Sequence, residues 1–325
     1  MSPDFSKNTT QPSILIAFGG NALDVRTGPN LHQKEEFIVA RRSMEQVVDL
    51  LEAGYERIVV THGNGPQVGR IFLQQELTKD EFSRQVTLDV CVADSQGRIG
   101  YILQNVFDNI CFKRKINKKT STVVTQVIVD KDDPAFSAPT KFIGTFYTKS
   151  QALNLEQERG WVMKEDVGRG WRRVVPSPMP KEIIEKKLFR TLLSMGFIAI
   201  GAGGGGIPVY RKPDGEIRGI EAVIDKDRTS ALLACDIGID IFVILTEADH
   251  IYIDYKKPTE KALGLVHLSE LDSYVKSGQF PDGSMGPKVG AAMSFVRNTG
   301  KKAIIANLFK LKDALDGKTG TTIIP

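Results

Sequence analysis

Three short apolar segments of this chain each run directly into a glycine-rich turn. The segments and their turns are residues 14–18 with 19–21 (GGN), residues 58–61 with 62–65 (HGNG), and residues 197–200 with 201–206 (GAGGGG). Apolar runs of this length that end in glycine are typical of buried strands. In an open parallel α/β sheet, ligands bind at the carboxyl ends of the strands. The pattern therefore predicts an α/β protein with a binding site along one edge of its sheet.

The segments between the expected strands have apolar residues at helical spacing. Apolar residues recur at helical spacing from Phe37 to Leu51, and Gly54 stands where a C′ glycine would end that helix. A second helix is expected over residues 184–195, before Gly196. Further strands are expected at 122–129, 241–245 and 303–306. Near-continuous apolar strands that alternate with helices predict a mainly parallel sheet covered on both faces.

One long segment lacks this alternation of strands and helices. Residues 130–180 are rich in proline, glycine, tryptophan and charge. We expect them to form a subdomain or lid inserted beside the sheet, although a long surface excursion without a role would have the same composition. Residues 1–13 are polar and are expected to be a disordered leader, so the main domain would span residues 14–325.

The overall charge and the cysteines limit the class of protein. Among 325 residues, 43 are basic and 39 are acidic, which gives a formal net charge of +4. This balance requires neither nucleic acid nor a membrane surface as a partner, although it would suit anionic substrates. The three cysteines are widely spaced and form no C-x-x-C pair, which argues against a disulfide framework or a zinc ribbon. The N-terminal residues lack the apolar run of a signal peptide, and no stretch reaches membrane-spanning length, so we expect a cytoplasmic protein.

The glycine-rich turns are candidate phosphate-binding sites. Glycine allows the backbone to approach a phosphate closely, and successive N–H groups can converge on the anion. One such turn would be weak evidence, because glycine also serves plain tight turns. Residues 201–206 match G-x-G-x-x-G, but the following Ile207-Pro208 predicts extended chain where a dinucleotide fold requires a helix. Residues 317–319 resemble the end of a Walker A loop, but Lys312 replaces its first glycine.

Phosphoryl transfer requires positive charge and accurate positioning, so lysines near these turns or at helix starts are candidate catalytic groups. Lys226 precedes the helix expected around residues 229–234, and Asp227 is placed to cap that helix. Lys288 opens the helix expected at 289–296, and Lys141 lies in the insert. Each lysine alone would ordinarily be a solvated surface residue.

A longer set of motifs changes that interpretation. The segments are AFGGNAL (17–23), THGNGPQVG (61–69), TQVIVDKDDPAF with PTKFIG (125–144), KEDVGRGWRRVVPSP (164–178), GGGGIPV (203–209), EAVIDKD (221–227), GSMGPKV (283–289) and GTTI (320–323). In these segments and in their order, the chain resembles carbamate kinases, which belong to the amino acid kinase superfamily. The KEDVGRGWRRVVPSP, GGGGIPV and EAVIDKD segments are the most specific, whereas the short GGN and GNG turns are shared more widely.

The resemblance implies a fold and a different binding role for each half of the chain. The fold would be a three-layer α/β/α sandwich with a mainly parallel central sheet, a small protruding subdomain at about 130–180, and a homodimeric assembly. The N-terminal half would mainly hold carbamoyl phosphate, and the C-terminal half would mainly hold the nucleotide. By match of motif, the substrate-binding residues would be Gly19, Gly20, Asn21, Gly63, Asn64, Gly203, Gly204 and Gly205.

The same match assigns catalytic groups and a nucleotide pocket. Lys141 would reach in from the protruding subdomain, and Lys226 would bracket the transferring phosphoryl group. Asp227 would organise the lysines or the metal environment, and Lys288 would contact the nucleotide phosphates. The nucleotide pocket would be lined by Thr246, Ala248, Asp249, Tyr252 and Met285.

Two positions depart from the family pattern. Phe142 replaces the proline usual in PTKPIG, which bears on the stiffness of the lid around Lys141. Glu247 and Ala248 replace the small residue and the valine that commonly follow the strand-ending threonine, which bears on the nucleotide pocket. Neither change removes a charged group from the candidate site.

The resemblance implies reversible phosphoryl transfer between carbamoyl phosphate with ADP and carbamate with ATP, running toward ATP in fermentative arginine breakdown. Mg²⁺ would be held mainly by nucleotide phosphates and water, without a protein metal site of its own. The histidines and cysteines provide no activated nucleophile, and His62 could contact substrate or make a structural hydrogen bond. Two alternatives stay open. One is another kinase of the superfamily, acting on acetylglutamate, glutamate, aspartate or UMP, and the other is a nucleotide-binding protein without catalysis.

Overall fold

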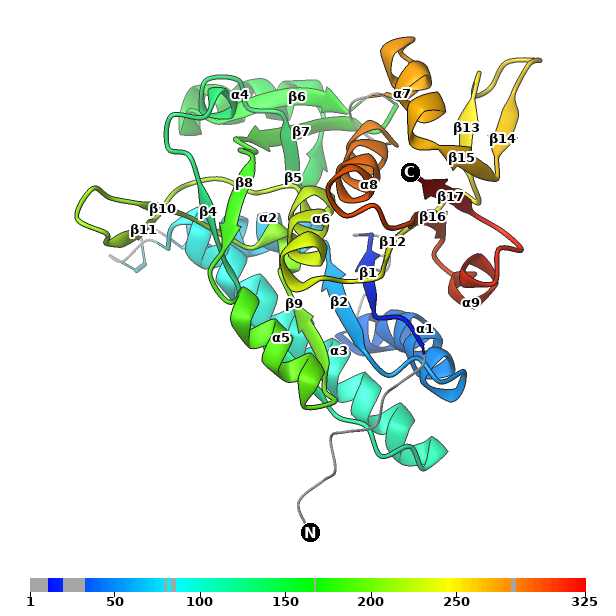
Figure 1. Cartoon of the computed structure of the whole chain (residues 1–325). Coiled ribbons are helices and arrows are strands. Elements are labelled where there is room, and N and C mark those ends of the chain that lie inside the picture. Colours follow the sequence, from blue (N-terminus) through cyan, green and yellow to red (C-terminus); the bar gives the residue numbers. More distant parts are fainter. Residues whose placement is uncertain (1–10, 20–32, 79–80, 83–85, 167, 282–284) are drawn as a thin grey trace.

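A large, mainly parallel sheet forms the centre of the protein (Figure 1). The computed structural model describes residues 11–19, 33–78, 81–82, 86–166, 168–281 and 285–325. Within them, the sheet has eight strands, in the spatial order β15 (Leu265–His267), β17 (Thr321–Ile324), β16 (Ala303–Asn307), β12 (Ile241–Thr246), β1 (Ile14–Phe18), β2 (Ile58–His62), β9 (Ile198–Gly201) and β3 (Thr120–Val123). All neighbours pair in parallel except β16 and β17. The expected α/β class is confirmed.

The three strands that end in glycine-rich turns are neighbours in this sheet. β1 pairs with β2, and β2 pairs with β9, both in parallel register. Their carboxyl ends therefore meet at the same edge, which is the topology that the sequence pattern predicts. The expected strands at 241–245 and 303–306 are also present, as β12 and β16.

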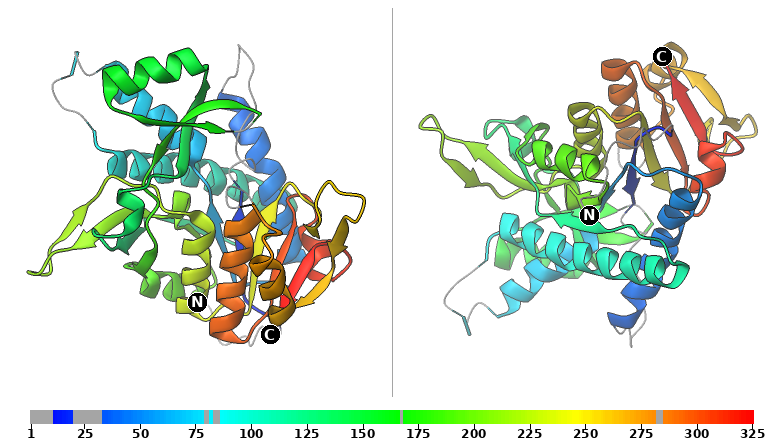
Figure 2. Two further views of the ribbon diagram at one scale, coloured as in Figure 1. Left: turned by 90° about the horizontal axis from the view of Figure 1, so that it is seen from above. Right: turned by 60° about the horizontal axis from the view of Figure 1, so that its bottom comes forward.

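Both faces of the sheet are covered by helices. All five residues of β1 are buried, and their side chains face two different cores in turn. Ile14, Ile16 and Phe18 share one apolar core with α1 (Gln33–Glu52) and α3 (Leu88–Arg114). Leu15 and Ala17 face the opposite core, which contains side chains of α5 (Lys186–Ser194), α6 (Lys226–Ile237) and α8 (Met285–Thr299). Figure 2 shows α6 and α8 side by side on that face. The three-layer α/β/α arrangement is confirmed.

The single strand expected at 122–129 is wrong, because two strands of different sheets occupy this segment. β3 belongs to the central sheet, and β4 (Gln126–Val129) joins a smaller sheet with β8 (Pro180–Ile183), β10 (Ile207–Arg211) and β11 (Ile217–Gly219). The chain bends at buried Thr125, whose N–H donates to Oε1 of Gln96 at 2.8 Å and whose hydroxyl accepts from the Ala202 N–H at 2.9 Å. These side-chain contacts replace the ladder bonds that a continuous strand would make.

The insert forms regular structure of its own. β5 (Lys141–Tyr147), β7 (Gly170–Val175) and β6 (Val162–Asp166) make an antiparallel sheet beside α4 (Lys149–Arg159). We call residues 141–175 the lid, and Figure 1 shows it in green at the top of the molecule. The lid packs on α2 (Gly65–Leu77) so closely that a Cβ on Gly69 would lie 2.1 Å from Cα of Gly144.

The remaining described elements lie mostly in the C-terminal part of the chain. They are β13 (Ile251–Ile253), β14 (Lys261–Leu263), α7 (Leu268–Lys276) and α9 (Leu311–Leu315), with short 3₁₀ turns at Pro134–Phe136 and Gly203–Gly205. The chain after Gly206 is the strand β10 and not a helix, so the rejection of a dinucleotide fingerprint is confirmed. Among the described residues, no helix combines the length and apolarity that a bilayer crossing demands.

The expected leader, residues 1–13, is only partly described, because residues 1–10 lie outside the described ranges. Ser13 is fixed to the domain: its N–H donates to Oδ2 of Asp240 at 2.9 Å and its hydroxyl donates to the same oxygen at 2.7 Å. The chain is therefore already attached to the domain at Ser13, just before β1.

Candidate active site

The start of α6 carries four consecutive charged residues, 225–228. Asp225 is the N-cap: its Oδ1 accepts the N–H groups of Asp227 at 2.9 Å and of Arg228 at 3.3 Å. The prediction that Asp227 caps the helix is wrong, since Asp227 already lies in the first turn. The cap at 225 places Lys226 and Asp227 on the helix itself, where both side chains are buried.

Two ammonium groups from different helices bind the carboxylate of Asp227. Lys226 Nζ donates to Oδ1, and Lys288 Nζ, from the first turn of α8, donates to Oδ2 at 2.9 Å. Only 3% of the Asp227 side chain is exposed, against 18% for Lys288. Since helix N-termini attract anions, two of them beside two lysines form a strongly electropositive corner.

The charges in this corner shift one another's pKa values. Burial lowers the pKa of Lys226, and repulsion by Lys288 adds to this, while attraction by Asp227 opposes it. Burial alone would raise the pKa of Asp227, but the two lysines outweigh it and lower that pKa. Burial would also lower the pKa of Lys288, but Asp227 raises it instead. Asp227 therefore favours the charged form of both lysines.

The glycine turn after β9 lies against this corner and has a backbone that other residues cannot easily adopt. Gly204 has φ of 64°, and a Cβ there would lie 2.1 Å from Nδ2 of Asn64. The carbonyl of Gly205 accepts a hydrogen bond from the Thr229 hydroxyl of α6 at 2.8 Å. The structure thus brings Asn64, the glycine turn and α6 together, as the motif match predicts.

The last residue of β2, His62, and the turn after it, with Gly63 and Asn64, follow next in the site. Asn64 is buried, and its Nδ2 donates to the Ser95 hydroxyl at 2.8 Å. His62 is also buried: its Nδ1 lies 3.1 Å from the Gly63 carbonyl oxygen, and a Cβ on Gly203 would lie 2.4 Å from its ring. Burial, with a smaller contribution from Lys226, lowers the pKa of His62 to about 4. The ring is therefore neutral at physiological pH and packs beneath the glycine turn.

The turn after β1 is only partly described. Gly19 lies at the end of β1, where a Cβ would come within 3.3 Å of the Leu245 carbonyl oxygen. The predicted site residues Gly20 and Asn21 lie outside the described residues.

Lys141 reaches the same corner from the lid. Its Nζ donates to Oδ2 of Asp225 at 2.7 Å. Below it, the N–H of Val223 donates to the Pro176 carbonyl at 3.0 Å, so the end of β7 is bound to the segment that leads into α6. Phe142, the residue that departs from the family pattern, lies 5.8 Å from the guanidinium of Arg172, measured to its ring centroid. The aromatic ring thus packs within the lid and leaves Lys141 directed at α6.

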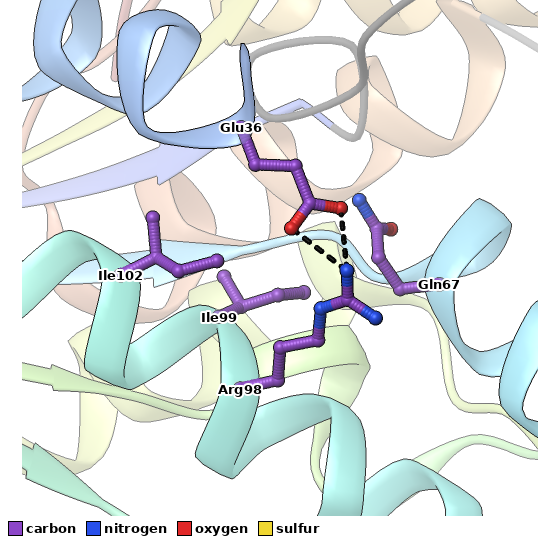
Figure 3. A pocket seen from close by; sticks show the side chains of 5 residues that line it. All are labelled: Glu36, Gln67, Arg98, Ile99 and Ile102. Carbon is purple, nitrogen blue, oxygen red and sulfur yellow. Dashed lines mark hydrogen bonds and ion pairs between the residues drawn. The ribbon is translucent and has the colours of Figure 1, made fainter. Parts of the chain in front are cut away.

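Two hollows lie near these residues. A cleft of about 1240 Å³ runs between the lid and the outer sides of α6 and α8, and Lys141 and Asp225 stand in its wall. The other is a small pocket between α1, α2 and α3, where Nη2 of Arg98 donates to both carboxylate oxygens of Glu36 at 2.9 Å beside Gln67 (Figure 3). Of these two hollows, the cleft borders the lysine corner through Lys141 and Asp225, whereas Lys226, Lys288 and the glycine turn do not line it.

The predicted nucleotide residues lie after β12 and at the start of α8. The carbonyl of Thr246 accepts the Leu308 N–H at 2.8 Å, and Asp249 forms an ion pair with Lys310 at 3.0 Å. Ala248 is half-buried in the same loop, and the ring of Tyr252 stacks edge-on to His250 at 6.2 Å. Met285 is the first residue of α8 and packs against the apolar core beneath it. Glu247 is exposed, and its carbonyl accepts a hydrogen bond from Nδ2 of Asn307.

Sequence reasoning missed several residues that hold the site together. Asp225 was not singled out, although an N-cap aspartate is what a helix that begins at Lys226 would predict. Gln96 was also missed: its Nε2 donates to the Gly203 carbonyl at 3.0 Å. Ser230 and Thr61, whose hydroxyls lie 2.7 Å apart, join α6 to β2. These contacts come from segments far apart in the chain and have no local motif.

The cysteines take no part in this site. Burial, with nearby acidic groups, raises the pKa of Cys91 to about 12, and burial raises the pKa of Cys111 and of Cys235. A thiol with a raised pKa is a poor nucleophile. These shifts make the three cysteines poor candidates for a catalytic nucleophile.

Comparison with known proteins agrees with this geometry. The family model described as "Amino acid kinase family" matches residues 12–307. A carbamate kinase of Pyrococcus horikoshii is 47% identical over 313 residues, 96% of this chain and 99% of that protein. A carbamate kinase of Clostridium perfringens is 46% identical over 314 residues, again 96% of this chain and 99% of the relative.

Solved structures give the same result. The carbamate kinase of Giardia lamblia bound to AMP-PNP superposes with a TM-score of 0.88 at 41% identity, covering 97% of this chain and 99% of that one. The same enzyme bound to citric acid gives a TM-score of 0.91 at 40% identity, with the same coverage. By fold, by sequence over nearly its whole length and by the family model, this chain belongs to the amino acid kinase family and, within it, to the carbamate kinases.

Proposed function

We propose that the protein transfers a phosphoryl group reversibly between carbamoyl phosphate with ADP and carbamate with ATP. The observation that carries this proposal is the pair of ammonium groups, Lys226 and Lys288, on the one buried carboxylate of Asp227. A transferring phosphoryl group spreads negative charge over its oxygens, and fixed positive charge stabilises it in the transition state.

Each group has a part in this transfer. Lys226 binds the oxygens of the phosphoryl group during its transfer, and Lys288 binds the nucleotide phosphates from the start of α8. Asp227 orients both lysines, since each donates to a different carboxylate oxygen. The backbone N–H groups of Gly203, Gly204 and Gly205, with Gly63 and Asn64, form the cradle for the carbamoyl end of the substrate.

The neutral His62 takes no proton in this scheme. Its pKa of about 4 leaves it uncharged, and its ring supports the glycine turn from below. Carbamate already carries the attacking oxygen as an anion, so in-line attack on the γ-phosphorus of ATP needs no general base and no covalent intermediate.

Mg²⁺ fits this site as a companion of the nucleotide. Asp225 and Asp227, the carboxylates nearest the lysines, are both bound to ammonium groups. The described residues contain no cluster of three or more histidine, cysteine or acidic side chains that could hold a metal. Mg²⁺ prefers phosphate oxygens and water, so the nucleotide phosphates would hold it, and it would neutralise part of their charge.

The nucleotide binds on the C-terminal side of the sheet. Its base lies against the loop with Thr246, Ala248 and Asp249, beside Tyr252 and Met285. The support is their position at the carboxyl end of β12 and at the N-terminus of α8, the places where α/β sheets bind nucleotides. The relative bound to AMP-PNP has the same fold over nearly its whole length.

The assembly and setting are proposed on separate grounds. A homodimer is supported by large apolar side chains that α1 and α3 leave exposed: Ile38 at 56%, Tyr101 at 58% and Phe112 at 85%. A cytoplasmic location is supported by the three cysteines, which form no disulfide. A place in fermentative arginine breakdown, with net flux toward ATP, is supported by the carbamate kinase relatives.

One assay tests the reaction. Protein, MgADP and carbamoyl phosphate are mixed and ATP is followed by a coupled enzyme, with a Lys226→Ala variant as the control for spontaneous decay of carbamoyl phosphate. We expect ATP with the wild-type protein and close to none with the variant. Acyl-phosphate formation from ATP with acetylglutamate, glutamate or aspartate, or phosphorylation of UMP, in the absence of ATP formation from carbamoyl phosphate, would replace this proposal by another kinase of the superfamily.

A further inference from the structure

Asp225 makes two different contacts with its two carboxylate oxygens. Oδ1 caps α6 through the N–H groups of Asp227 and Arg228. Oδ2 accepts the ammonium of Lys141, which comes from the lid. A helix cap requires only one acceptor oxygen, so the second contact is additional to the capping role.

The charge of Asp225 is strongly favoured in this position. Burial alone would raise its pKa, but attraction and hydrogen bonding by Lys141, with further attraction by Lys226 and Lys288, hold the pKa well below its usual range. Its side chain is 14% exposed and that of Lys141 29% exposed, so the pair is partly shielded from water. A charge-assisted hydrogen bond in such a place is stronger and better aligned than one at the surface.

The backbone fixes the two partners on one rigid frame. Lys141 pairs with Val175 across β5 and β7, and the next residue, Pro176, binds the N–H of Val223. Val223 lies two residues before Asp225. The base of the lid and the start of α6 are therefore tied together at this point, and the freedom that remains is that of the Lys141 side chain and of the rest of β5.

The ion pair removes that freedom without using up the ammonium group. A lysine side chain has roughly 2 kcal/mol of rotamer entropy to lose when it is held in place. Its Nζ has three N–H groups, and Asp225 takes one of them. The others can meet oxygens of a bound anion.

We infer that Asp225 is a positioning residue for the reaction, which holds Lys141 of the lid over the start of α6 in the orientation that receives the phosphoryl-bearing substrate. Asp225 acts through Lys141 and touches no substrate itself. This inference rests on the proposed function, since it assigns Lys141 to the substrate of that reaction.

The test separates the two roles of Asp225. In Asp225→Asn, the amide oxygen can still cap α6, because asparagine is as good a cap as aspartate, but the charge that holds Lys141 is lost. Asp316→Asn is the matched control, because it removes the same charge from an exposed ion pair with Lys318 that lies outside the cleft. Both variants are made in the wild-type background and in a Lys141→Met background.

The expected result is a loss confined to one substrate. Asp225→Asn should raise the KM for carbamoyl phosphate and lower kcat/KM for it roughly 10- to 100-fold, since a misplaced reacting partner costs on this order. The KM for ADP should change by less than about threefold, and the melting temperature by no more than a few degrees. In the Lys141→Met background, Asp225→Asn should have little further effect, because residues that act as a unit are not additive.

Two results would overturn the inference. One is an equal loss from Asp225→Asn with and without Lys141, which would mean that Asp225 acts independently of the lid. The other is a variant as active as wild type or faster, which would mean that the ion pair only restrains Lys141 and must break before substrate binds.

Hydrogen exchange gives a readout that does not depend on activity. Amides of β5 should exchange faster in Asp225→Asn than in Asp316→Asn, because the lid has lost its side-chain tie to α6. If the wild-type protein forms no ATP from carbamoyl phosphate, the proposed function fails. A faster exchange of β5 would then still support the tie between Asp225 and Lys141, and unchanged exchange would overturn it.

Discussion

Lys288 and Lys226 approach the carboxylate of Asp227 from two helices that are far apart in sequence, and each binds a different oxygen. Two buried like charges close together repel, and they are stable only because the carboxylate lies between them. The arrangement therefore holds positive charge ready for an anion before any substrate arrives.

Replacing Asp227 with Asn should destabilise the protein and impair it. Loss of one partner from a buried ion pair costs about 3–5 kcal/mol, because the remaining charge is left uncompensated. Without Asp227, the pKa of Lys226, already lowered by burial, falls further. Because Lys226 acts as an ammonium group, kcat should begin to fall at a lower alkaline pH in the variant than in wild type. Urea unfolding and the pH dependence of kcat measure the two effects.

The control for Asp227→Asn is Asp316→Asn, in an exposed pair that should contribute less than about 1 kcal/mol. If Asp227→Asn unfolded at the same urea concentration as this control, the carboxylate would have no structural role. An unchanged alkaline limb would show that Asp227 does not keep Lys226 protonated.

Replacing Lys226 with Ala should lower kcat steeply. Removing one group that stabilises transition-state charge costs about 100- to 1000-fold, and a lysine beside the transferring group belongs to this class. The KM for ADP should change little, because Lys288 still binds the nucleotide phosphates. Lys187→Ala on the exposed side of α5 is the control and should be fully active. Turnover near that of wild type in Lys226→Ala would remove Lys226 from the mechanism.

Gly204→Ala tests the glycine turn, and Gly215→Ala provides the comparison. Both glycines have positive φ, 64° at Gly204 and 89° at Gly215, but a Cβ would meet Asn64 at 2.1 Å in the first case and nothing within 4 Å in the second. Backbone strain alone costs about 1–3 kcal/mol, which both variants share. Only Gly204→Ala should also displace Asn64 and lose activity, by about tenfold or more.

Steady-state kinetics and thermal unfolding of the two glycine variants separate strain from steric displacement. Equal activity in both would show that the turn after β9 tolerates a side chain facing Asn64. Such a result would argue against close backbone approach to a substrate at this turn.

The sequence predicted β1, β2 and β9 because they are short apolar runs that end in glycine, a local signal. It failed at residues 122–129, where the bend at Thr125 depends on Gln96 and Ala202, which are distant in the chain. It placed the helix cap at Asp227 in place of Asp225, an error of two residues that only the hydrogen bonds correct.

The candidate site was predictable in its residue types and not in its connections. Lys141, Lys226 and Lys288 stand in recognisable motifs, but no motif records that Asp225 binds the first and Asp227 the other two. These pairings depend on how the lid and α8 pack against α6. Packing between distant segments is the information that a single sequence encodes least directly.

The acid stability of the fold should depend on Asp240. Burial alone would raise its pKa, but hydrogen bonds from Lys301 and Ser13 outweigh it and lower the pKa from 3.8 to about 2. A carboxyl whose pKa is lower in the folded state stabilises the protein above its unfolded pKa and loses that contribution as the pH falls toward 2. Since 37% of its side chain is exposed, solvent screening limits this contribution to about 1 kcal/mol.

Asp240→Asn should therefore lower the free energy of unfolding near pH 7 by about 1 kcal/mol and flatten its dependence on pH between 4 and 2. Urea unfolding at several pH values measures both effects. Asp272→Asn, in an exposed ion pair with Arg297, is the control. The same slope in wild type and in Asp240→Asn between pH 4 and 2 would mean that Asp240 titrates alike in the folded and unfolded chains. Its contacts with Ser13 and Lys301 would then contribute nothing to the attachment of residues 11–13, since a carboxylate that gains stability from its folded-state partners must bind protons less readily there.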